Sequence, residues 1–254
     1  MSDSLKQISK KMLLGINISV IDQPELLQAI DELVQKKQVA LVNNVNVQAC
    51  NLAVEHTDFR AILNQSEIVF CDGFGVKLGA WLRGIRLGQR MTPPDWIDAL
   101  FARCVEKKYR IYFLGDTDEV VKDFARLVQE RYPKLSIVGW HSGFFELESE
   151  ENNQVLEAID KSKTDLILTG MGMPRQERWA WAAKPKLHQG VIIATGALFR
   201  WYTDHERRAP KWITASGLEW LARFMTHPIR HFKRYIIGLP RFFWRVIFSS
   251  RSRG

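Results

Sequence analysis

The sequence predicts an α/β fold: a Rossmann-like, mostly parallel, doubly wound sheet with a small helical C-terminal appendage. Short apolar runs alternate along the chain with longer segments whose apolar residues recur at helical spacing. Several of these runs end in Gly, Asp or Asn, where a strand would turn into the next helix. From residue 218 the composition becomes basic and aromatic. We therefore expect an α/β domain over residues 1–217 and an appendage over residues 218–254.

The apolar runs indicate where the strands lie. Each run is rich in Val, Ile, Leu or Phe and is bounded by polar or turn-forming residues. The first expected strand, residues 12–20, alternates weakly and would pair as a short antiparallel element. The later expected strands span residues 39–42, 68–70, 110–114, 136–140, 165–169 and 191–194.

Capping residues and helical spacing place helices between these strands. Asp22 is typical of an N-cap, and the apolar residues of 26–34 fall on one face. One helix is expected to follow residues 43–46 and to run through Leu63. Another begins at the Pro93-Pro94 pair, because proline suits the first helical turn. Further helices are expected over residues 120–131 and 148–161, and after Pro174.

Composition limits the class of protein. The chain has 254 residues, of which 46% are hydrophobic and 25% charged, as is usual for a globular protein with a sizeable core. Its three cysteines are far apart and form no CxxC pair or His/Cys cluster, so we expect a reducing cytoplasm and no structural metal. The N-terminal segment is polar, so we expect no signal peptide. No apolar run approaches the roughly 20 residues that a spanning helix needs.

The stretch from Glu67 to Lys77 is expected to bring a carboxylate to the ligand-binding edge of the sheet. Its apolar run ends at Asp72, and Gly73 and Gly75 follow. Ligands of open α/β sheets bind beyond the carboxyl ends of the strands, and glycine lets the backbone bend and a ligand approach. Asp72 is thus a candidate catalytic residue and Gly73 a candidate binding residue. The alternative is that Asp72 only caps the next helix.

A Gly-Met-Gly sequence at residues 170–172 lies between an expected strand and an expected helix. The pattern partly matches a dinucleotide-binding motif, but Arg175 stands where the third glycine belongs, and no acidic residue ends the next strand. Two glycines and a helix N-terminus still suit a phosphate or a carbohydrate. Gly172, Gln176 and Glu177 are therefore candidate substrate-binding residues.

Asp116-Thr117-Asp118 follows another expected strand. The pattern resembles the metal-binding Asp-x-Asp of many nucleotide-sugar transferases. The alternative, which we favour, is that Asp116 or Thr117 caps the next helix while Asp118 lies in its acidic first turn.

The formal net charge of +8 lies almost entirely at the C-terminal end. Residues 200–254 contain 12 Lys/Arg and 3 Asp/Glu, a charge of +9, whereas the preceding 199 residues sum to −1. Basic residues among aromatic ones can bind an anionic membrane surface, pack in a core or an oligomer, or bind nucleic acid. The apolar content of residues 236–248 favours a membrane surface over nucleic acid.

Together these motifs resemble the WecG/TagA/CpsF glycosyltransferases (glycosyltransferase family 26), from about Leu14 to about Tyr235. Several blocks in the same order make the resemblance specific. The blocks are Val45-Asn46, Cys71-Asp-Gly-Phe-Gly-Val76, Gly143-Phe-Phe145, Gly172-Met-Pro-Arg-Gln-Glu177, Arg208-Ala-Pro210, Gly217-Leu-Glu-Trp-Leu-Ala-Arg223, and Pro228 with Arg230.

The resemblance implies an inverting transfer of a sugar from a UDP-sugar to a sugar carried on undecaprenyl pyrophosphate. It implies a bacterial enzyme bound peripherally to the cytoplasmic face of the inner membrane, acting in the synthesis of exopolysaccharide, teichoic acid or common antigen. It implies neither a cofactor nor an Asp-x-Asp metal site. The donor stays open among N-acetylmannosamine, glucose and uronic-acid types. Off the membrane, the apolar appendage favours homo-oligomers.

The resemblance also implies roles for individual residues. Asp72 is the expected general base. The expected pocket residues are Asn44, Asn46, Arg90 and Gln176, with Arg223, Arg230 and Lys233 contributed by the appendage.

This chain departs from the family pattern at three positions. Asn44 replaces a usual Thr, which keeps a hydrogen-bonding side chain. Arg200 replaces a usual Asp, so we expect Arg200 to help select the substrate. Asp204 replaces a Gly.

Two other classes of function stay open on the sequence. A non-catalytic scaffold could bind membrane or nucleic acid through the basic tail, but it would not need Asp72, Arg90 and Gln176 together. A Rossmann oxidoreductase would need a nicotinamide or flavin cofactor.

Overall fold

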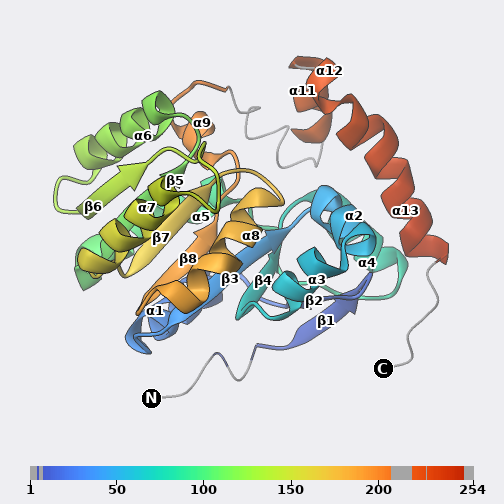
Figure 1. The fold of residues 1–254 in the computed structure, drawn as a ribbon. Helices are drawn as coiled ribbons and strands as arrows, with labels where there is room; N and C mark the ends of the chain where they lie inside the picture. Colours follow the sequence, from blue (N-terminus) through green and yellow to red (C-terminus); the bar gives the residue numbers. More distant parts are fainter. Residues whose placement is uncertain (1–4, 6–7, 207–218, 227, 249–254) are drawn as a thin grey trace.

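Six parallel strands form the central sheet, and helices cover both of its faces (Figure 1). The computed structural model describes residue 5 and residues 8–206, 219–226 and 228–248. The strand order is β4-β3-β8-β7-β5-β6, and a separate two-stranded antiparallel sheet pairs β1 with β2. The strands are β1 (Lys10–Leu13), β2 (Ile16–Ser19), β3 (Val39–Val45), β4 (Ile68–Cys71), β5 (Arg110–Gly115), β6 (Ser136–His141), β7 (Leu166–Gly170) and β8 (Gly190–Ala194).

The helices lie where capping residues and apolar spacing predict most of them. Asp22 caps the first helix with a reciprocal capping box, and Pro93 opens the fifth after a similar box. The helices are α1 (Gln23–Gln35), α2 (Val47–Glu55), α3 (Thr57–Asn64), α4 (Phe74–Leu82), α5 (Pro93–Lys107), α6 (Asp118–Arg131), α7 (Glu150–Lys161), α8 (Arg175–Ala183), α9 (Leu198–Tyr202), α11 (Glu219–Thr226), α12 (Pro228–Phe232) and α13 (Gly238–Phe248), with the short 3₁₀ and π segments η2 (Lys184–Lys186) and η3 (Lys233–Ile237).

Alternating side chains of the strands form two separate hydrophobic layers. One layer packs α1, α5, α6 and α9 against side chains such as Val42, Phe113 and Ile193. The opposite layer packs α2, α3, α4 and α13 at one end of the sheet and α7 and α8 at the other. The Rossmann-like, doubly wound arrangement predicted from the sequence is therefore confirmed.

The carboxyl ends of the strands form one edge of the sheet, which carries the residues singled out by the sequence. In strand order, the residues that leave this edge are Asp72 after β4, Asn46 after β3, Thr195 after β8, Met171 after β7 and Asp116 after β5. Because all five strands are parallel, these residues lie in one row at the edge where α/β proteins bind ligands.

The single helix expected through Leu63 is in fact two helices. His56, with φ −126° and ψ 104°, is extended and separates α2 from α3. Each helix buries its own apolar face, with Ala53 on α2 and Phe59 on α3. On one continuous helix, these two residues would lie about 120° apart around the axis. Because the helix is interrupted at His56, Ala53 and Phe59 can both pack into the core.

The C-terminal helices pack onto the α/β domain. The helical run continues from Pro228 to Phe248 through α12, η3 and α13, and Pro240 lies within it, near the start of α13. Phe242 and Val246 of α13 are fully buried in the layer that contains α2 and α4. Figure 1 shows α13, in red, lying beside α2 and α4. The expected boundary at residues 217–218 falls outside the described residues.

Within the described ranges, no helix combines the length and the apolar content needed to cross a bilayer.

Candidate active site

Asp72 lies at the carboxyl end of β4, directly before the N-terminus of α4. Its backbone N–H donates to the carbonyl of Val45 over 2.9 Å, which fixes it beside the end of β3. The alternative that Asp72 caps α4 is not what the structure shows, because Gly73 is the N-cap residue. Gly73 has φ +101° and ψ 145°, a conformation that favours glycine, and its nearest neighbour on the open side is Asn46. The half-buried Asp72 carboxyl is thus held at the sheet edge.

Arg90 lies on a loop that passes the same end of β4 as Asp72. The N–H of Met91 donates to the carbonyl of Cys71 over 3.1 Å, so the loop that carries Arg90 runs past the end of β4. Burial, with a smaller contribution from the charge of Asp72, raises the pKa of the Cys71 thiol to about 12, and the charges of Lys77 and Arg90 oppose the rise. The charges of Asp72 and Arg90 are therefore both close enough to the buried sulfur of Cys71 to affect its pKa. Arg90 also pairs with Asp95, at 3.5 Å.

Asn44 and Asn46 lie at the end of β3 and have different surroundings. Asn46 is the N-cap of α2, where its Oδ1 accepts from the N–H of Ala49 over 3.1 Å. It is half-buried and faces Gly73. Asn44 is buried, and its Nδ2 donates to the carbonyl of Ala194 over 2.8 Å. Asn44 therefore links β3 to β8 through a side-chain hydrogen bond, a structural role that the sequence did not reveal.

The Gln176 side chain is buried and is not exposed at the ligand-binding edge of the sheet. Its Oε1 accepts from the N–H of Gly196 over 3.2 Å, and its Nε2 donates to Oε1 of Glu177 over 2.8 Å. The side chain thus fixes the loop after β8 to the first turn of α8. The expectation that Gln176 lines the pocket becomes a narrower proposal, in which Gln176 shapes the pocket wall through Gly196.

Glu177 is a buried acid that accepts a hydrogen bond from the side chain of Gln176. Its side chain is fully buried, and within the described part of the chain its Oε2 has no hydrogen-bond partner. Burial raises the pKa of this carboxyl from 4.5 to about 7, and the hydrogen bond from Gln176 limits the rise. Glu177 is therefore set back from the site and is mainly protonated below about pH 7.

Arg175 joins a second loop to α8. Its Nε donates to the carbonyl of Gly143 over 3.2 Å, and its Nη2 donates to the carbonyl of Phe145. The sequence marked Arg175 only as the residue that breaks a glycine motif, so this role was missed. Its position inside the family-like block Gly172–Glu177 was the available signal. Gly172, with φ +75°, turns the chain from β7 towards α8 and has open space beside its Cα.

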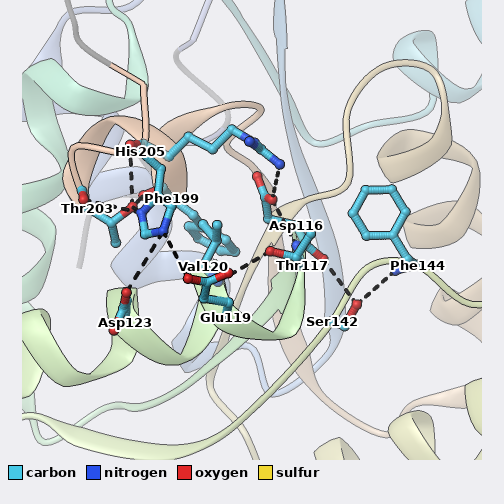
Figure 2. A network of polar contacts seen from close by, with 11 residues as sticks. Asp116, Thr117, Glu119, Val120, Asp123, Ser142, Phe144, Phe199, Thr203 and His205 are labelled. Atoms are coloured by element: carbon cyan, nitrogen blue, oxygen red, sulfur yellow. Dashed lines mark hydrogen bonds and ion pairs between the residues drawn. The ribbon is translucent and has the colours of Figure 1, made fainter.

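Asp116 and Arg200 form an ion pair at the end of β5. An Nη2 of Arg200 lies 2.6 Å from Oδ1 of Asp116, and that oxygen also accepts from the N–H of Thr117 over 2.8 Å. Asp116 is almost fully buried, whereas Arg200 is partly exposed. Figure 2 shows Asp116 and Thr117 with Ser142 and Phe144 of the neighbouring loop. The pairing was missed because Asp116 and Arg200 lie 84 residues apart.

The Asp116-Thr117-Asp118 sequence caps α6, as favoured above. Thr117 is the N-cap residue, and its Oγ1 faces the N–H of Val120 at 3.4 Å. Asp118 is exposed in the first turn of α6, whereas Asp116 is buried. Across residues 5, 8–206, 219–226 and 228–248, no three His, Cys, Asp or Glu side chains are grouped so that they could hold a metal ion.

The appendage residues are only partly described. Lys233 is exposed on η3. The backbone of Arg223 lies in α11 and that of Arg230 in α12, but their side chains are outside the described part of the structure. The Arg208-Ala-Pro210 block is outside it as well. Among the described residues of the appendage, Leu239 lies beside Gly75, in the first turn of α4.

Comparisons with known proteins agree with this layout. The sequence model of the glycosyl transferase WecG/TagA/CpsF family matches residues 11–254. A relative from Bacillus subtilis (strain 168) is 25% identical over 220 residues, which cover 87% of this chain and 84% of the relative. Another from Staphylococcus aureus (strain MW2) is 24% identical over 251 residues, which cover 96% and 94%.

Both relatives are named N-acetylglucosaminyldiphosphoundecaprenol N-acetyl-beta-D-mannosaminyltransferase. The match spans the α/β domain and the C-terminal helices, so both parts of the fold are covered. The chain therefore belongs to the WecG/TagA/CpsF family of glycosyltransferases.

Proposed function

We propose that the chain is an inverting glycosyltransferase that moves a sugar from a UDP-sugar to a sugar linked through a diphosphate to undecaprenol. Membership of the family and the names of the relatives support a sugar transfer of this kind. The observation that carries the proposal is the catalytic corner: the half-buried Asp72 carboxyl at the end of β4, with the loop that carries Arg90 running past the same strand end. The product enters the synthesis of a bacterial surface polysaccharide.

Asp72 is the general base of the proposed reaction. Its carboxylate takes the proton from the acceptor hydroxyl, whose oxygen then forms the new bond to the anomeric carbon of the donor sugar. The bond from that carbon to the diphosphate breaks on the opposite side, and UDP leaves with the bonding electrons. Arg90 is placed to stabilise the charge that develops on the diphosphate, and its planar guanidinium can bind two oxygens at once.

The row of strand ends suggests how the donor lies. Asp116 follows β5, four strands away from β4, which is about 19 Å at the usual spacing between strands. One atom cannot contact both Asp72 and the Asp116–Arg200 pair. A nucleotide sugar laid along the edge can reach both, with its reacting sugar at Asp72 and its nucleoside towards β5.

Arg200 then contacts the donor rather than the reacting centre. Asp116 holds one nitrogen of its guanidinium, and the partly exposed side chain keeps further N–H groups for a ligand. At position 200, where the family pattern usually has an Asp, this chain has an Arg that is paired with the Asp116 carboxylate. We expect Arg200 to alter how the donor is chosen and to leave the proton transfer unaffected.

The described C-terminal helices support peripheral binding to a membrane. The buried side of α13 carries Phe242 and Val246, whereas Trp244, Ile247 and Phe248 are exposed on its outer side. An apolar outer face among basic residues suits the interface of an anionic bilayer, which is where an undecaprenyl-linked acceptor is found. Arg223, Arg230 and Lys233 are proposed to meet the diphosphates of the substrates from this side.

Replacement of Asp72 tests the proposal. Wild-type protein is incubated with an undecaprenyl-diphosphate-linked N-acetylglucosamine and with UDP-N-acetylmannosamine, UDP-glucose or a UDP-hexuronic acid, and the lipid product and released UDP are measured. Asp72→Asn should lower turnover by about 10²–10⁴-fold while UDP binding is retained. Asp58→Asn, which removes an exposed carboxylate on α3, is the matched control. Turnover by Asp72→Asn at the wild-type rate would remove the base from the mechanism.

A further inference from the structure

The exposed face of α4 carries an apolar stripe. Phe74 is 48% exposed, Trp81 68% and Leu82 48%, and the half-buried Leu78 lies between them. Their positions, i, i+4, i+7 and i+8, fall on one side of a helix. Exposed apolar side chains gathered on one helix face, rather than scattered singly, indicate a surface that is covered in function.

The other face of α4 is firmly packed. Val76, Gly79 and Ala80 are buried, and Gly79 lies so close to Phe242 of α13 that an added Cβ would come within 2.6 Å of the ring. At the end of the helix, Nη1 of Arg83 donates to the carbonyl of Val246 over 3.1 Å. The stripe is therefore presented by a helix whose orientation is fixed by α13.

The charges around the stripe all have one sign. Between Gly73 and Pro94 the sequence contains Lys77, Arg83, Arg86 and Arg90 but no acidic residue. Lys77 and Arg86 are exposed. Residues 228–248 likewise contain five Lys/Arg and no acidic residue. A protein partner would have to be acidic as well as apolar, whereas a bilayer with anionic headgroups provides both properties on one surface.

We propose that α4 is a second membrane-binding element, which places the catalytic domain itself against an anionic bilayer. Phe74, Trp81 and Leu82 insert among the headgroups, while Lys77 and Arg86 meet the lipid phosphates. Helix α13 holds α4 in place and contributes its own exposed face beside it (Figure 1). Binding to the bilayer does not depend on the proposed sugar transfer, but the consequence for catalysis rests on it.

That consequence follows from the short distance along the chain between the stripe and the catalytic corner. Phe74, the first residue of α4, is two residues after Asp72. If Phe74 lies at the headgroups, the Asp72 carboxyl is held at the level where the diphosphate of a lipid-linked acceptor emerges. Contact through α4 therefore sets the height and the tilt of the site over the membrane. Anchoring through α13 alone would leave the domain able to rotate about that helix, so the tilt would stay variable.

Trp81 gives the sharpest test, because it is the most exposed residue of the stripe and is not part of the catalytic corner. The full chain is sedimented with vesicles of phosphatidylcholine, with and without phosphatidylglycerol. Trp81→Glu should weaken binding to the anionic vesicles by about tenfold or more, and Trp81→Ala should have a smaller effect in the same direction. Trp140→Ala, at a tryptophan of β6 that is 44% exposed at the far edge of the sheet, is the matched control and should bind normally.

Activity separates the catalytic consequence from simple anchoring. Trp81→Glu should lose activity on the undecaprenyl-linked acceptor in vesicles and keep wild-type activity on a water-soluble acceptor with a short lipid chain. Unchanged vesicle binding by Trp81→Glu, or binding that is equally strong without phosphatidylglycerol, would overturn the proposal. If the wild type transfers no sugar to either acceptor, the proposed function fails, and the vesicle data still decide whether α4 binds membranes.

Discussion

Replacing Glu177 by Gln should make the protein more stable at alkaline pH and change little at acid pH. Glu177 is fully buried, and its pKa rises from 4.5 to about 7 in the folded state. The folded protein therefore holds a proton between these two pH values that the unfolded chain has released. The stabilisation by this group is complete below about pH 4.5 and is lost as the pH rises through about 7.

The size of the effect follows from the pKa difference. One pKa unit corresponds to about 1.36 kcal/mol, so a rise from 4.5 to about 7 corresponds to roughly 3 kcal/mol once the carboxyl is ionised. Gln keeps an oxygen that accepts from Nε2 of Gln176 and cannot ionise. Near pH 8, Glu177→Gln should thus be more stable by up to about 3 kcal/mol, or roughly 6–12 °C in Tm for a domain of this size.

Thermal unfolding of both proteins between pH 4.5 and 8.5 measures this difference. The advantage of Glu177→Gln should be close to zero at the acid end and grow steadily through pH 7. Glu148→Gln, at an exposed position before α7, is the control for loss of a carboxylate. A difference that does not vary with pH, or a wild type that is more stable at pH 8, would refute the reasoning.

Three further changes test the geometry around the site. Gly73→Ala forces a side chain into φ +101° and should cost at least 1–2 kcal/mol in urea unfolding; no loss would contradict the strained turn. Gly79→Ala puts a Cβ against the ring of Phe242, so it should destabilise the fold by about 1–3 kcal/mol and speed hydrogen exchange in α13, and exchange at the wild-type rate would argue against the contact. Arg200→Ala leaves the buried Asp116 carboxylate without its cation, so a double-mutant cycle with Asp116→Asn should give a coupling of about 0.5–3 kcal/mol, whereas simple additivity would mean that the pair contributes nothing.

The sequence predicts the sheet and the place of Asp72 because both depend on local pattern. Each apolar run marks a strand, and the ends of parallel strands necessarily share one edge. Asp72 after one run and Asn46 after another are therefore expected on the same edge, and they lie close together because β3 and β4 are neighbours in the sheet. Helix starts at Asp22 and at Pro93 follow equally from local capping chemistry.

What the sequence could not give depends on contacts between distant segments. The Asp116–Arg200 pair exists because β5, β7 and β8 are neighbours, and no local pattern specifies that order. The burial of Gln176 depends in the same way on the loop that carries Gly196. The docking of α13 depends on the absence of a side chain at Gly79, which looks like an ordinary glycine within a helix.

The docking of α13 also determines when the enzyme can mature during its synthesis. Nη1 of Arg83, at the end of the helix that follows Asp72, donates to the carbonyl of Val246, which is made 163 residues later. A nascent chain folds from its N-terminus as it leaves the ribosome, so β3, β4 and α4 emerge before α13 can pack on α2 and α4. Until Phe242 and Val246 arrive, the apolar side chains that they cover are exposed for chaperones to bind. The corner around Asp72 is thus among the first parts of the protein to be translated and among the last to be completed.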